Sequence, residues 1–164
     1  MPRTLITPID GDASRQAAVA VWEAARRATG RRSSPERVER VAATVANHVE
    51  SGDVALLAHY GERVAGALVA EPFVGDDGAE TGRGHLSMVV VDPALWGCGV
   101  ASALVRAVQG GVHGPGWSRL SVWTRESDAR ARRLYLARGF VDTGERATLH
   151  EGELISRWEW RAEG

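Results

Sequence analysis

Small residues follow a short apolar strand at one place in the sequence, in a pattern typical of an anion-binding turn. Three valines at residues 89–91 precede Asp92-Pro93, which ends the expected strand, and the segment from Trp96 to Ser102 then begins a helix. The first N–H groups of a helix have no intrahelical partner, and the helix dipole favours negative charge beside them. The expected ligand is therefore a phosphate or a pyrophosphate. A tight strand–helix turn that binds nothing has the same pattern.

A second group of residues surrounds a tyrosine on a later helix. Asp128 follows an expected strand and is a good N-cap, because its carboxylate can accept a hydrogen bond from the first helical turn. Ala131, Leu134 and Tyr135 then share one helical face, and Gly139 ends the helix. Taken alone, a tyrosine at this spacing is typical of a buried core aromatic.

Together the two stretches resemble the motifs of the GNAT superfamily of acyl-CoA-dependent N-acyltransferases. The family's pyrophosphate motif is Gln or Arg, two residues, Gly, one residue, and Gly or Ala. Here Trp96 takes the first place, Gly99 the fourth and Ala101 the last. The resemblance implies that the cofactor pyrophosphate is bound by the backbone N–H groups of Gly97, Cys98, Gly99, Val100, Ala101 and Ser102.

The later motif of the family has Asn, then Ala, Leu-Tyr and Gly-Phe. In this sequence Asp128 stands where Asn is usual, and Ala131, Leu134, Tyr135, Gly139 and Phe140 match the rest. The resemblance implies that Asp128 contacts the cofactor and that Tyr135 is the acid for the leaving thiolate. It also implies that the pantetheine arm pairs, like an added strand, with the backbone of Val89, Val90 and Val91.

The implied reaction is the direct attack of a neutral amine on the thioester of acetyl-CoA, which serves as co-substrate. The base for the amine proton is open among Glu71, His85, Glu126 and His150, alone or through water. The acceptor is a small-molecule or peptide amine. Acidic residues at 71–80 could attract a cationic amine, although a solvated acidic loop explains them equally well. The alternative is a non-catalytic CoA-binding or sensing module on the same fold, which the lack of one evident base and the departures at Trp96 and Asp128 favour.

Composition and charge argue against several other classes of protein and of binding site. The chain has 164 residues and a formal net charge of -1, so neither nucleic acid nor a membrane is an expected partner. All 20 basic residues are arginine, so the lysine of a Walker-type phosphate loop is missing. The one cysteine, Cys98, excludes an internal disulfide and fits a reducing compartment, with the cytoplasm as the default location. No His, Asp or Glu spacing is typical of a metal site, and no metal is expected.

The expected elements must place these two stretches side by side. We expect strands at residues 3–9, 54–60, 63–70, 85–91, 119–124, 140–148 and 154–161, with helices between residues 12 and 28, 35 and 49, 97 and 109, and 128 and 138. The first helix would be capped by Asp12 or Ser14, and residues 71–84 would form a mobile loop.

This order predicts an α/β (α+β) fold in one GNAT-like domain over residues 1–164. It would have a single mixed, mostly antiparallel central sheet of about seven strands, flanked by helices, with a parallel crossover at 85–124. Trp158 and Trp160 share a strand face and would pack in the core or at the interface of a homodimer. Trp22 and Trp123 are expected in the core, with an acceptor pocket as the alternative.

Overall fold

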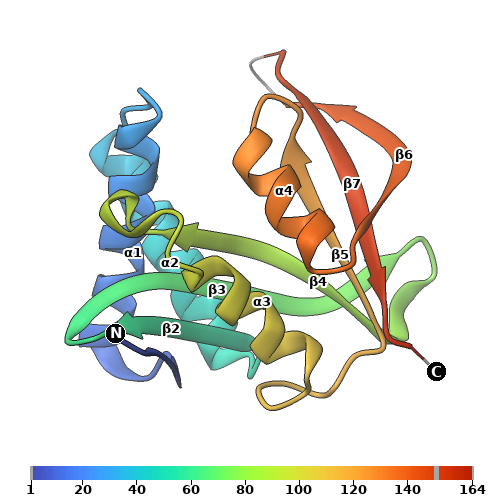
Figure 1. Ribbon diagram of the computed structural model, residues 1–164, viewed down its shortest axis with the longest axis horizontal. Coiled ribbons are helices and arrows are strands. Elements are labelled where there is room, and N and C mark those ends of the chain that lie inside the picture. The colour runs from blue at the N-terminus through green and yellow to red at the C-terminus, as the bar shows by residue number, and fades with distance from the viewer. Residues whose placement is uncertain (1, 150–151, 164) are drawn as a thin grey trace.

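The computed structural model describes residues 2–149 and 152–163, which form one seven-stranded sheet in the order β1-β2-β3-β4-β5-β7-β6 (Figure 1). Neighbouring strands are antiparallel except β4 and β5, which are parallel and joined through a helix. The predicted mixed, mostly antiparallel sheet and its parallel crossover are therefore confirmed. The strands are β1 (Thr4–Pro8), β2 (Val54–Tyr60), β3 (Arg63–Gly75), β4 (Gly78–Val91), β5 (Arg119–Arg125), β6 (Val141–Thr148) and β7 (Leu154–Arg161).

Four α-helices cover the two faces of the sheet. In Figure 1, α3 (Val100–Gln109) and α4 (Ala129–Ala137) lie in front, and α1 (Gly11–Ala28) and α2 (Pro35–Glu50) lie behind the β2–β3 half. A short 3-10 turn, η1 (Pro93–Leu95), leads from β4 towards α3. No helix among the described residues has both the length and the apolar composition needed to cross a membrane.

Each face of the sheet buries its own apolar cluster. On the α3 and α4 side, the fully buried Leu68, Leu104, Leu120 and Phe140 pack together. Trp158 belongs to this cluster and Trp160 packs against it, so the core alternative holds for the tryptophan pair. On the α1 and α2 side, the second cluster joins Ile9, Ala18, Val45, Ala55, Leu57, Ala67 and Val69.

Two of the four α-helices, α2 and α4, begin with a residue whose side chain accepts an N–H of the first turn. Ser34 accepts the N–H of Arg37 at 3.2 Å ahead of Pro35, as expected for α2. The predicted caps Asp12 and Ser14 of α1 are wrong, because the helix begins earlier, at Gly11. Ser14 lies in the first turn instead, and its hydroxyl accepts the N–H of Asp10 at 2.8 Å.

The acidic stretch at 71–84 is not a mobile loop, because β3 and β4 continue through it as a long hairpin. Arg83 anchors the hairpin: it is 6% exposed, its guanidinium donates to Glu80 and Glu159 at 3.0 Å each, and it stacks on Phe73. Exposed Gly, Asp and Glu residues at the end of a hairpin have the same composition as a loop, which explains the wrong prediction.

The two halves of the sheet diverge in its middle. β4 pairs with β5 only over residues 83–86, which face 119–122. Ser87 then forms a bulge, since Leu86 pairs with Ala70 but Met88 pairs with Val69. A bulge bends a strand and increases its twist. Beyond it, residues 89–91 of β4 pair with β3 on one side, and on the side of β5 they pair with no strand.

Candidate active site

A cavity of about 930 Å³ lies where β4 and β5 diverge. Its walls come from the end of β4, the turn before α3, α4, and the facing sides of α1 and α2. It brings together Tyr135 and all but one of the cofactor contacts predicted from the sequence. The predicted residues that line it are Val89, Val90, Val91, Gly97, Gly99, Val100, Ala101, Ser102, Asp128 and Tyr135.

The turn before α3 presents backbone donors to this cavity. Gly97 and Gly99 both have φ of +82°, a left-handed conformation that glycine adopts without strain. The first N–H bond into the helix that follows runs from Ala103 to the Gly99 carbonyl, at 3.0 Å. The N–H groups of Val100, Ala101 and Ser102 therefore have no intrahelical acceptor.

Cys98 is the predicted cofactor contact that the structure does not bring to the cavity. It is exposed, and its N–H donates to the Leu95 carbonyl at 3.2 Å. This donor is already used inside the turn, whereas the residues on either side of it, Gly97 and Gly99, line the cavity.

Trp96, which replaces the usual polar residue of the motif, joins the end of β4 to α4. Its indole N–H donates to the Val91 carbonyl at 3.1 Å, and the Arg130 guanidinium lies 3.5 Å from the centre of its ring. A guanidinium at this distance from an indole makes a cation–π contact. The Trp96 ring thus contacts both the end of β4 and α4, which form two walls of the cavity.

Tyr135 lines the cavity from the buried face of α4. It is 5% exposed and its ring packs edge-on against Phe140, with 5.3 Å between the ring centres. Burial raises the pKa of the phenol well above its ordinary value, and the charge of Asp128 raises it further. Tyr135 therefore keeps its proton near neutral pH and can only donate it. Asp128 accepts the N–H of Ala131 at 3.0 Å, which confirms it as the N-cap of α4.

Of the predicted bases, the three that the structure describes do not line the cavity. His150 lies outside the described residues, and Glu71, His85 and Glu126 do not line it. The His85 ring is 2.8 Å from the Ser121 hydroxyl. Burial lowers its pKa, Glu71 opposes this shift, and Arg157 and Arg83 add to it, so the imidazole is neutral at pH 7. Glu126 forms an ion pair with Arg146 on the β6 side.

A second, smaller cavity of about 540 Å³ shares part of the wall of the first. Sequence reasoning missed it, although the arginine-rich junction of the first two helices was a visible signal. Among described residues its charged lining is one carboxylate, Glu153, and five arginines: Arg26, Arg31, Arg37, Arg40 and Arg125.

Glu153 is fully engaged by its neighbours. It pairs with Arg31 and Arg125, each at 2.9 Å, and accepts from the Ser127 hydroxyl at 3.1 Å. Burial would raise its pKa, but the hydrogen bonds from Arg125 and Ser127 and the arginine charges outweigh this and hold the pKa below its ordinary value. The wall is thus basic, and the acidic stretch predicted to attract a cationic amine, residues 71–80, lines neither cavity.

Trp22 lines the larger cavity from α1, where the Arg26 guanidinium lies 5.2 Å from the centre of its ring. Its expected place in the core is wrong, and an acceptor pocket around it stays a prediction. Trp123 is 36% exposed on β5 and is not a core residue either.

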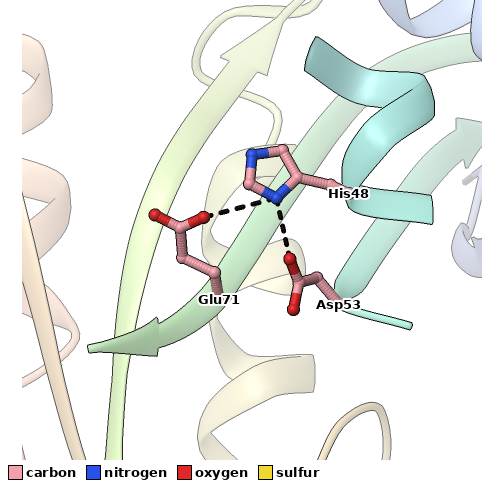
Figure 2. Close-up of side chains that lie close together, drawn as sticks. All are labelled: His48, Asp53 and Glu71. Carbon is pink, nitrogen blue, oxygen red and sulfur yellow. Dashed lines mark hydrogen bonds and ion pairs between the residues drawn. The ribbon is translucent and has the colours of Figure 1, made fainter. Parts of the chain in front are cut away.

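A trio of polar side chains lies away from both cavities. Figure 2 shows the interactions of Asp53 and Glu71 converging on one nitrogen of His48: Nδ1 is 2.9 Å from Asp53 Oδ2 and 3.3 Å from Glu71 Oε2. The ligand atoms of all three lie within 4.8 Å of one another, a spacing that could hold a metal ion. A carboxylate can only accept, so the Nδ1 next to it carries the hydrogen. In this arrangement Nδ1 has no lone pair for a metal, and the trio ties the end of α2 to β2 and β3.

Comparisons with known proteins agree with this geometry. Residues 18–140 match the acetyltransferase (GNAT) family, whereas a search of curated proteins gave no match. This match covers more than half of the chain. The chain therefore belongs to the acetyltransferase (GNAT) family.

Solved structures show the same fold. The ribosomal-protein-S18-alanine N-acetyltransferase from Escherichia coli has a TM-score of 0.74 and 17% identity, over 99% of this chain and 96% of that one. An N-acetyltransferase from Staphylococcus aureus Mu50 has a TM-score of 0.77 and 15% identity, over 98% and 99%. The NatC complex bound to Gag peptide and CoA has a TM-score of 0.70 and 15% identity, over 98% and 99%.

Proposed function

We propose that this protein is an N-acetyltransferase that transfers the acetyl group of acetyl-CoA to a primary amine by direct attack. The observation that carries the proposal is the cavity at the divergence of β4 and β5. It combines an open strand edge, a helix start with unused N–H donors, and a buried protonated phenol.

The donor half of the cavity fits acetyl-CoA. The N–H groups of Val100, Ala101 and Ser102 suit a pyrophosphate, because a helix start supplies both hydrogen bonds and a favourable dipole. The edge of β4 at Val89, Val90 and Val91 pairs with no strand on this side, so it suits the amides of a pantetheine arm, which would pair with it like an added strand. The Val91 carbonyl already accepts the Trp96 indole N–H. Gly97 and Gly99 would leave room for close approach, and Asp128 would lie beside the cofactor from α4.

The chemistry forms one C–N bond and breaks one C–S bond. The amine nitrogen attacks the thioester carbonyl, and the backbone N–H near Val89 stabilises the oxygen that gains charge. The products are the acetylated amine and CoA, whose sulfur takes up one proton. Tyr135 donates a hydrogen bond to that sulfur, because its raised pKa keeps the phenol protonated, and the sulfur takes its proton from the water that receives the amine proton.

Proton removal from the amine needs no dedicated side chain in this proposal. Glu71, His85 and Glu126 do not line the cavity, and Glu153, with its lowered pKa, is a weak base. We propose that the amine binds in its neutral form and releases its proton to water during the attack.

Two measurements on the purified protein test this function. Acetyl-CoA binding is measured by isothermal titration calorimetry, and thiol release is followed with a panel of primary amines. Binding together with amine-dependent thiol release supports the proposal. Tight binding without thiol release across the panel would instead favour a non-catalytic CoA-sensing module, and no binding at millimolar acetyl-CoA would refute both.

We also propose that residues 1–164 form one domain of this kind and act in the cytoplasm. The solved structures cover nearly the whole chain, which supports the first point. The exposed free thiol of Cys98 is compatible with a reducing compartment, which supports the second.

A further inference from the structure

The smaller cavity lies on the acceptor side of the proposed site. Its lining comes from α1, α2, the link between them, β5 and the residues around the β6–β7 turn, and it includes no residue of the turn at 96–102 or of α4. Those two segments form the proposed phosphate-binding side. The smaller cavity adjoins the larger, because five residues line both: Arg26, Arg31, Arg37, Val41 and Arg125.

Among the residues that the structure describes, five arginines and one carboxylate line this cavity. Its one described carboxylate, Glu153, is held by Arg31 and Arg125. Arg26 donates from Nε to Ser33 and stacks on Trp22, which fixes its guanidinium at the border between the cavities.

Two further arginines of this wall stand on α2. Within residues 2–149 and 152–163, Arg37 and Arg40 have no ion-pair partner. Arg37 is half-buried and lines both cavities, whereas Arg40 is exposed and lines the smaller one. A half-buried guanidinium without a partner loses hydration and gains no ion pair, so an anion placed beside it would be bound strongly.

We propose that the acceptor is an amine that also carries an anionic group, a carboxylate or a phosphoryl-type group, and that Arg37, with Arg26 and Arg40, binds this group. The proposal rests on the N-acetyltransferase function above and names its substrate class. The anion occupies the smaller cavity, and the amine points into the larger one, towards the open edge of β4. A cationic polyamine is repelled by the same wall.

Matched amines test the substrate class. The purified full chain is assayed for thiol release with an amino acid, the aminophosphonic acid of the same skeleton, the amide of the amino acid, and a polyamine. We expect kcat/KM to be at least about tenfold higher for the anionic amines, since one charge-assisted hydrogen bond has this effect. The first two amines distinguish a carboxylate from a phosphoryl-type group.

Two variants test the proposed role of Arg37. Arg37→Gln should raise KM for the anionic amines by about tenfold, with acetyl-CoA affinity and kcat nearly unchanged. Arg32→Gln is the matched control, because Arg32 lies in the same region, is exposed and lines neither cavity. It should leave KM as in the wild type.

The possible outcomes distinguish a failure of this inference from a failure of the proposed acetyltransferase function. Equal kcat/KM for charged and neutral amines overturns the inference and leaves the acetyltransferase function standing. A loss of acetyl-CoA affinity in Arg37→Gln also overturns it, because the arginines would then bind acetyl-CoA and not the acceptor amine. If no amine releases thiol, the proposed function fails and the inference fails with it.

Discussion

Burial decides what Tyr135 can do. The pKa of its phenol is raised first by loss of solvent and then by the charge of Asp128, so the proton stays on the oxygen throughout the neutral range. A phenol with a raised pKa is a weak acid in the free protein. It remains a good hydrogen-bond donor to a sulfur that gains negative charge, since that charge strengthens the bond only during the reaction.

Replacing Tyr135 by Phe removes this donor and keeps the ring that packs on Phe140. We expect kcat to fall by about a hundredfold, which is within the range of a lost general acid, with acetyl-CoA affinity nearly unchanged. Steady-state kinetics and calorimetry measure the two quantities. Tyr60→Phe is the control, because Tyr60 lies on β2 and lines neither cavity. Equal kcat in Tyr135→Phe and the wild type would remove Tyr135 from the acid role.

His85 gives a prediction for stability against pH. Burial lowers its pKa in the folded protein below the ordinary value of 6.5. As the pH falls below that value, the unfolded chain binds a proton that the folded chain does not, so the free energy of unfolding must decrease. Urea unfolding between pH 8 and pH 5 measures this. His85→Gln should show a smaller decrease over this window, and an identical pH profile in both proteins would contradict the assignment.

At the scale of elements, the two left-handed glycines set the turn before α3. An added Cβ at Gly99 meets no atom within 4 Å, but φ of +82° strains any other residue. Gly99→Ala should lower the free energy of unfolding by about 1 kcal/mol and should also weaken acetyl-CoA binding, because the turn shifts to relieve the strain.

Gly144 provides the matched control for this variant. It has φ of +87°, also has no atom within 4 Å of an added Cβ, and lies on β6, away from the cavity. Gly144→Ala should therefore have a similar effect on stability and no effect on acetyl-CoA affinity. If the two variants weaken binding equally, the turn is not the site of contact.

The junction of α2 with β2 and β3 depends on His48. Without its ring, the partly buried carboxylates of Asp53 and Glu71 would lose their shared donor (Figure 2). We expect His48→Ala to lower the free energy of unfolding by about 1–2 kcal/mol, with kcat/KM unchanged. Unfolding is measured with and without added zinc. A loss of stability that appears only when zinc is present would show that the trio is a metal site.

The elements that carry strong local patterns could be predicted from the sequence. Ser34-Pro35 and Asp128 identify the starts of two helices through capping, and the apolar strands around the turn identify the parallel crossover. The hairpin at 71–84 could not be predicted in this way. Its strands depend on long-range contacts such as that of Arg83 with Glu159.

The donor side of the site was predictable because the motifs for it are continuous in sequence. The acceptor side was not, because its wall joins Arg26, Arg37 and Arg125 from three separate elements. Only the folded sheet brings those arginines to one cavity. The bulge at Ser87, which opens the sheet, likewise leaves no signal in the composition.

At the scale of the whole molecule, the divergence of β4 and β5 organises the proposed activity. The β1–β4 half carries the open strand edge, and the β5–β7–β6 half carries Tyr135 through α4 (Figure 1). Acetyl-CoA would enter between α3 and α4, and the amine would approach from the arginine-lined side, between α1–α2 and β5. The two substrates would thus meet between the two halves of the sheet, and neither half alone forms the site.

The most direct measurement is the identification of the product by mass spectrometry. The protein is incubated with acetyl-CoA and a mixture of primary amines, and both the amines and the released CoA are quantified. We predict one amine that gains the mass of a single acetyl group on its nitrogen, in equal amount to the CoA formed, and about a hundredfold less of this product with Tyr135→Phe at the same early time. Bound acetyl-CoA that stays intact with every amine, or CoA released by hydrolysis without an acetylated amine, would contradict this prediction.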